Sequence, residues 1–288
     1  MRLEISTHKL AGGILLGAVA SGLAMTALSG AGSAGATCAS ISGIGNGNGC
    51  ASTPTSVAIG IGPNTFAEAN GLFDVAIANG ATNTGTQFTS AVSIGTANLA
   101  YAGGPNVAAF AGTSPGILPG PGGGSFNVAI AQGSNVLAAA GSGNLNGTDV
   151  GNVAINIADD PTGMFGQNNV RAGGFSLVSP QPGVGNIAVN IGGTAGPLAN
   201  GNTVTAFGQG NLATNLGGTG NFIAAGNPFA FGLPPGTPTT PATFSTAFGI
   251  GGSNNTVVAA PGPFNVAGEI NHTGTPGTLT ALNTIKIG

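Results

Sequence analysis

The residues that could carry out chemistry are few, and the first candidate is a serine in nucleophile-elbow spacing. Gly112-Thr113-Ser114-Pro115-Gly116 matches G-x-S-x-G, in which the residue after the serine donates its backbone N–H to the oxyanion hole. Here that residue is Pro115, which has no N–H. The C-terminal nine-tenths of the chain offers a single histidine, His272, as a base. We therefore do not expect acyl transfer.

Paired carboxylates suggest a second chemistry, glycoside hydrolysis. Asp159 and Asp160 are adjacent and precede a proline, a pattern typical of turns. The other acidic residues beyond the N-terminal segment are isolated: Glu68, Asp74, Asp149 and Glu269. The basic residues in the same part of the chain are Arg171 and Lys286, too few to assemble a convincing acid–base site. The sequence predicts no enzyme, no cofactor and no metal site.

The N-terminal segment, residues 1–36, has the features of a secretory signal peptide. Arg2 and Lys9 precede an uncharged apolar stretch at 10–28, and Ala34-Gly35-Ala36 matches an A-x-A cleavage pattern. A membrane anchor is the alternative, but no basic stop-transfer flank follows. The phosphate-loop-like pattern at 30–35 follows no strand and lies inside this segment. We expect a secreted or cell-surface protein with no stable membrane span after cleavage.

Cys38 and Cys50, the two cysteines of the chain, follow the predicted cleavage point. In an exported protein such a pair predicts a disulfide. A redox or metal site would need C-x-x-C spacing or a neighbouring histidine, and neither is present. We expect a structural disulfide at one end of the fold.

Composition separates the chain from ordinary soluble proteins. Of 288 residues only 4% are charged, 41% are hydrophobic, and the net charge is −3. Glycine and proline are abundant, but disorder usually combines low hydrophobicity with high net charge. An ordered fold is therefore expected. Nucleic-acid binding is excluded because phosphate neutralisation requires many basic side chains.

A four-residue phrase, apolar–small–apolar–small, recurs along the chain. It begins at Val57, Val75, Val92, Val128, Val153 and Ile187, with looser copies at Val107, Val204, Phe222 and Ala247. A second phrase follows about nine residues later, beginning at Phe66, Leu99, Val136 and Leu212. Both phrases alternate with the period of a β-strand, and glycine and asparagine between them suit tight turns.

Two strands and two turns per period predict an all-β fold, a β-solenoid with about 17–18 residues per coil. Each coil is too thin to bury its own apolar residues, so neighbouring coils must stack. We expect Val57, Val75 and Val92 to form one column along the axis. Helix is disfavoured by the density of glycine.

This pattern predicts four regions of the chain. The signal peptide, 1–36, is followed by a disulfide-stapled cap at 37–55, a repeat domain at 56–268 and a capping segment at 269–288. Proline-rich or aperiodic stretches near 115–125, 159–185, 194–201 and 233–242 are expected to leave the coil as loops.

The repeat resembles the head of YadA-like trimeric autotransporter adhesins. The likeness is carried by Ser56-Val57-Ala58-Ile59-Gly60 and Ala67-Glu68-Ala69-Asn70-Gly71, and it covers about residues 56–110. It implies a β-roll that displays a host-binding surface. The period here is longer, and no heptad stalk or anchor barrel follows, so trimerisation and autotransport are not implied. The composition is also similar to that of glycine- and asparagine-rich exported proteins of mycobacteria.

We expect a non-catalytic structural or adhesin-like repeat protein that binds an extracellular or cell-envelope ligand not identified by the sequence. The alternative is a self-assembling fibre or envelope component that associates through exposed coil ends. An extracellular carbohydrate-active enzyme ranks last.

Overall fold

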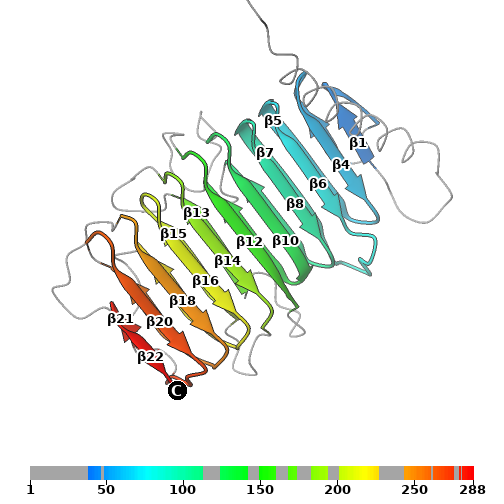
Figure 1. The fold of residues 1–288 in the computed structure, drawn as a ribbon. Helices are drawn as coiled ribbons and strands as arrows, with labels where there is room; N and C mark the ends of the chain where they lie inside the picture. Colours follow the sequence, from blue (N-terminus) through cyan, green and yellow to red (C-terminus); the bar gives the residue numbers. More distant parts are fainter. Residues whose placement is uncertain are drawn as a thin grey trace, which may run out of the picture.

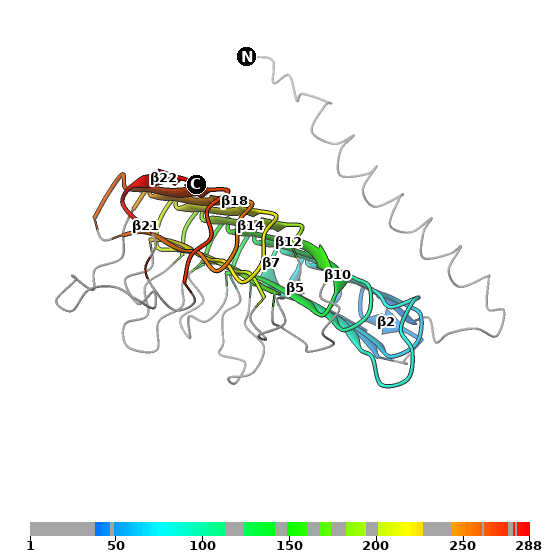
Figure 2. The same ribbon diagram turned by 90° about the horizontal axis from the view of Figure 1, so that it is seen from below.

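A computed structural model of the chain describes residues 38–46, 49–112, 124–141, 149–159, 168–173, 183–193, 201–226, 243–260, 262–275, 279 and 281–288. The predicted signal peptide and most of each expected loop lie outside these residues. The described residues contain strands and no helix, so none could form a helical membrane span. They form two long sheets that face each other across a narrow interior (Figures 1 and 2). The fold is the predicted β-solenoid.

Sheet A is the twelve-stranded layer drawn towards the viewer in Figure 1. Its strands are, in spatial order, β2 (Ile44–Gly45), β1 (Cys38–Ile41), β4 (Val57–Ile61), β6 (Val75–Asn79), β8 (Leu99–Gly103), β10 (Val128–Ser134), β12 (Val153–Asp159), β14 (Ile187–Ile191), β16 (Leu212–Leu216), β18 (Thr246–Ile250), β20 (Val266–Ile270) and β22 (Ile285–Ile287). All neighbours from β4 onwards pair in parallel, whereas β1 pairs antiparallel with both β2 and β4.

Sheet B contains the other ten strands, and all of its pairs are parallel. Its strands are, in chain order, β3 (Cys50–Ser52), β5 (Thr65–Leu72), β7 (Thr89–Thr96), β9 (Val107–Ala111), β11 (Val136–Ala140), β13 (Asn168–Gly173), β15 (Thr203–Phe207), β17 (Phe222–Ala225), β19 (Thr256–Ala259) and β21 (Ala281–Leu282). From β4 onwards the chain alternates between the sheets, so each pair of consecutive strands completes one coil.

The interior is built from small side chains. Along sheet A the inward residues are mainly alanines such as Ala76, Ala129 and Ala188, each fully buried. Sheet B contributes alanines and a few larger residues, including Val136 and Ile223. Because parallel strands in neighbouring coils satisfy each other's backbone groups, a thin alanine core suffices to bring the two sheets together.

The coil length differs from the prediction. The step from Val57 to its partner Val75 spans 18 residues, as expected, but the step from Val153 to Ile187 spans 34. The regular period applies only where no extra segment separates two strands. The stretch 159–185, expected to be a loop, also contains β13, which pairs with β11 and β15.

The predicted column is also partly wrong. Val57 and Val75 are neighbours in sheet A, but the next residue of that row is Leu99. Val92 lies in sheet B, between Glu68 and Phe110. Both sheets use the same alternation of small inward and larger outward residues, so the phrase alone does not distinguish them.

Both ends of the stack carry short strands. The Cys38–Cys50 disulfide is formed, as predicted, and joins β1 of sheet A to β3 of sheet B. At the other end, the expected capping segment at 269–288 contains two short strands, β21 and β22, one in each sheet. Short strands limit the unpaired backbone available at a sheet edge.

Candidate interaction surface

Three rows of outward side chains cover sheet A, and we call them the apolar face. The first row is Val57, Val75, Leu99, Val128, Val153, Ile187, Leu212, Thr246 and Val266. The second is Ile59, Ile77, Tyr101, Ile130, Ile155, Val189, Thr214, Phe248, Gly268 and Ile285. The third is Ile61, Asn79, Gly103, Gln132, Ile157, Ile191, Leu216, Ile250, Ile270 and Ile287.

The apolar face is uncharged and, apart from the buried Ile59, Gly103 and Gly268, at least partly exposed. Its third row is the most open, with Ile157 at 39%, Ile191 at 46% and Leu216 at 44% exposure. None of the residues in the three rows is charged. Large contiguous apolar patches are uncommon on monomeric soluble proteins and mark interaction sites. The apolar face is therefore the strongest candidate for a functional surface among the described residues.

Phenylalanines extend this surface at the corner that leads into sheet A. Phe73, Phe126, Phe244 and Phe264 have φ between 54° and 61° and exposures of 59–74%. A bulky side chain at positive φ is strained, and here burial compensates little of that strain. The rings of Phe244 and Phe264 stack with centroids 5.7 Å apart. Strained, exposed aromatic residues point to a role outside the stability of the coil.

A ladder of buried side chains holds the same corner in register. The Oδ1 atom of Asn127 accepts hydrogen bonds from the backbone N–H and the Nδ2 of Asn152, both at 3.0 Å. The same contacts link Asn98 to Asn127 and Asn152 to Asn186. Each side chain thus positions the residue just before a strand of the apolar face.

Asp74 occupies this ladder on the disulfide side of the stack. Its Oδ1 accepts from the backbone N–H and the Nδ2 of Asn98, while the buried Oδ2 has no hydrogen-bond partner. Burial raises the pKa of the Asp74 carboxyl above its ordinary value, and the hydrogen bonds from Asn98 oppose that shift.

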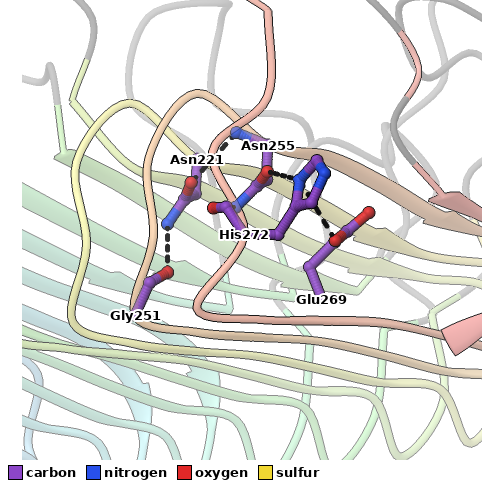
Figure 3. Close-up of polar contacts among 5 residues, drawn as sticks. All are labelled: Asn221, Gly251, Asn255, Glu269 and His272. Carbon is purple, nitrogen blue, oxygen red and sulfur yellow. Dashed lines mark hydrogen bonds and ion pairs between the residues drawn. The ribbon is translucent and has the colours of Figure 1, made fainter. Parts of the chain in front are cut away.

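A second ladder lies at the corner that leads into sheet B. Asn168, Asn202, Asn221 and Asn255 are linked by backbone N–H donors at 2.7–3.0 Å. His272 ends it, with Nδ1 3.0 Å from the Oδ1 of Asn255 (Figure 3).

Neither ladder was predicted from the sequence. The available signal was the asparagine or serine that precedes many of the repeat phrases. An asparagine or serine at this position predicts a turn. Recognising a ladder requires knowing which coils are adjacent.

His272 also contacts Glu269, which is fully buried on the inward side of β20. The Nδ1 of His272 lies 3.3 Å from the Oε2 of Glu269 (Figure 3). This pair closes the second ladder at the C-terminal end.

The other residues considered for chemistry lie elsewhere. Asp159 ends β12, with Oδ1 3.4 Å from the Oγ of Ser134. Arg171 lies on β13 of sheet B, its Nε donates to the Oδ1 of Asn169, and burial lowers its pKa. Ser114 and Asp160 lie outside the described residues. Within the described parts of the chain, no group of three or more histidine, cysteine or acidic residues could hold a metal ion.

No protein-family model, curated protein or solved structure matches the chain. The Cys38–Cys50 disulfide indicates an oxidising compartment. The fold thus follows from the chain itself, and the apolar face is the surface from which a function can be argued.

Proposed function

We propose that the protein is a non-catalytic structural or adhesive module of the cell surface or extracellular space, and that it associates through the apolar face. The observation that carries this proposal is the uncharged, exposed Val/Ile/Leu surface of sheet A. Burying apolar side chains against a partner is favourable by about 25 cal/mol per Å². No catalytic geometry is needed for such a role.

The resemblance of residues 56–110 to YadA-like adhesin heads supports a displayed module, since those heads are β-rolls with a binding surface. The signal-peptide features of residues 1–36 support export. Together these observations favour a position outside the cell, where a charge-poor solenoid meets envelope or matrix components.

A binding panel tests this proposal. Immobilised octyl groups, cell-wall polymers, matrix proteins and glycans are probed with the full chain and with an Ile155→Lys/Val189→Lys variant of the apolar face. An Asn70→Lys/Thr203→Lys variant adds the same charge to the outer side of sheet B and serves as the control. All three proteins carry the same N-terminal segment.

We expect the natural chain and the control to bind at least the octyl surface, and the face variant to lose that binding. Circular dichroism establishes that all three are folded. Binding of the face variant to octyl groups as strong as that of the natural chain would contradict the proposal. So would the absence of binding to any probe by the natural chain at concentrations at which it is monomeric.

A further inference from the structure

We infer that the partner of the apolar face is a second copy of this chain, packed face to face with the first. This inference rests on the proposed function, because it names the occupant of the same surface. Shape, size, charge and the nature of the coil ends each support it.

The shape of the apolar face suits a second sheet. Sheet A forms one continuous layer along the coil stack (Figures 1 and 2). Its rows repeat at the spacing of parallel strands, about 4.8 Å. A second copy presents the same repeat, so side chains of the two sheets can interdigitate as in a β-sandwich, with the sheets about 10 Å apart.

The size of the face matches a stable interface. Five residues per strand span about 17 Å, and the ten strands from β4 to β22 span about 43 Å, which gives about 700 Å² per copy. A pair would bury about 1,400 Å², within the range of about 1,200–2,000 Å² seen for stable interfaces. The phenylalanine corner adds to this area.

The charge pattern permits contact between identical surfaces. A twofold axis brings the same patch of each copy together, so any charge on the face would meet itself or be buried without a partner. The three rows contain no charged residue, and their polar members, among them Gln132 and Thr214, are few.

The coil ends are poorer sites for self-association. The edge strands β2, β3, β21 and β22 have two or three residues each. They offer few unpaired backbone groups for end-to-end pairing. Self-association is therefore expected across the apolar face, rather than through the ends as the sequence suggested.

The first test measures oligomeric state. Sedimentation equilibrium of the full chain over a wide concentration range is expected to give a dimer that dissociates on dilution. Two lysines in a buried apolar interface are expected to raise the dissociation constant at least about 100-fold in the Ile155→Lys/Val189→Lys variant. The Asn70→Lys/Thr203→Lys control should dimerise like the natural chain.

The second test introduces a cysteine instead of lysines. Its outcome therefore does not depend on whether the lysine variant folds. Ile155 lies in the middle row on β12, midway along the stack (Figure 1). A twofold axis through the centre of the face brings this position close to its own copy. Both native cysteines are already joined, so Ile155→Cys provides the only thiol. We expect an intermolecular disulfide, and none for Thr203→Cys on sheet B.

Failure of this inference can be told from failure of the proposed function. A monomer at all concentrations, with no cross-link at position 155, overturns the second copy as partner while octyl binding still supports the apolar face. Assembly of the lysine face variant as readily as the natural chain also overturns the inference. A natural chain that stays monomeric and also fails to bind octyl groups removes both proposals.

Discussion

The two sheets bear apolar residues on their outer sides, and sheet A exposes more of them than sheet B. On sheet B, Val92, Phe110 and Leu137 are each 8% exposed and pack in one cluster with neighbouring side chains. On sheet A, Ile157 and Ile191 are 39% and 46% exposed. Apolar patterning is therefore similar on the two faces, whereas burial is not. The face that the fold leaves open is the one available to a partner.

The corners do not share this asymmetry. A ladder of asparagines precedes the strands of each sheet, and in both ladders side-chain oxygens accept backbone N–H donors from the next coil. The coil thus supports both sheets in the same way, and the difference between them is confined to the outward side chains.

The largest expected effect compares one outward residue from each sheet. Phe110→Ala should lower the free energy of unfolding by about 3–5 kcal/mol, because the ring is buried and leaves a cavity. Ile157→Ala should cost about 1 kcal/mol or less in the monomer, because its side chain is already substantially exposed. Urea unfolding of dilute protein measures both. Equal losses would mean that the two faces do not differ as described.

Ladder substitutions should affect both corners alike. Asn152→Ala leaves the buried backbone N–H of Asn186 without its acceptor, and Asn202→Ala does the same to that of Asn221. Each should lower the free energy of unfolding by about 2–3 kcal/mol. A large difference between them would extend the asymmetry of the sheets to the corners.

Serine offers a matched control for this effect. The Oγ of Ser56 accepts the backbone N–H of Asp74 at 3.1 Å, as an asparagine does in later coils. Asn152→Ser should therefore recover part of the stability lost in Asn152→Ala. No recovery would show that side-chain volume, rather than the acceptor, matters at this position.

The solenoid, the strand phrases and the disulfide could be predicted because alternation and cysteine placement are local signals. The column through Val57, Val75 and Val92 was wrong at Val92, because segments of variable length separate the strands. The 17-residue spacing from Val75 to Val92 imitates a complete coil, although Val75 pairs with Leu99. Sequence spacing alone cannot show where the chain crosses from one sheet to the other.

The apolar face was harder to predict, because alternation does not say which set of residues points inwards. The usual expectation places large apolar residues inside. Here the sheets enclose alanine and asparagine, such as Ala154 and Asn156, while Ile155 points outwards. The polar residues could have indicated which side points inwards. Asn156 lies on the same side of its strand as the alanines, whereas Gln132 lies on the same side as the large apolar residues.

Asp74 should make the corner that leads into sheet A sensitive to pH. Its pKa is raised in the folded state, so folding favours the protonated carboxyl and stability falls as pH rises through the window between the ordinary value near 3.8 and the raised one. The ladder at the other corner contains neutral Asn168. Relative to Asp74→Asn, the natural chain should therefore gain stability as the pH is lowered through that window.

Urea unfolding at a series of pH values measures this difference. An Asn168→Ala variant controls for general acid effects, since it should lose the same stability relative to the natural chain at each pH. A difference in the free energy of unfolding between the natural chain and Asp74→Asn that is the same at every pH would contradict the ionisation of a buried Asp74.

The smallest expected effect concerns the strained phenylalanines beside the apolar face. Phe126 has a φ of 58° and is 63% exposed, while the next coils place Gly151 and Gly185 at the same corner. Asparagine tolerates this conformation, so Phe126→Asn should raise the free energy of unfolding of the monomer by about 0.5–1 kcal/mol.

Phe207 provides the contrast on sheet B, because its ring is 8% exposed and Phe207→Asn should destabilise the fold. If Phe126→Asn also weakens dimerisation, the same substitution will have stabilised the coil and weakened the contact between the two copies. Such opposite signs are expected of a side chain whose strain is offset only when a partner covers it. Destabilisation of the monomer by Phe126→Asn would instead assign the ring to the coil and limit the interaction surface to the three rows of sheet A.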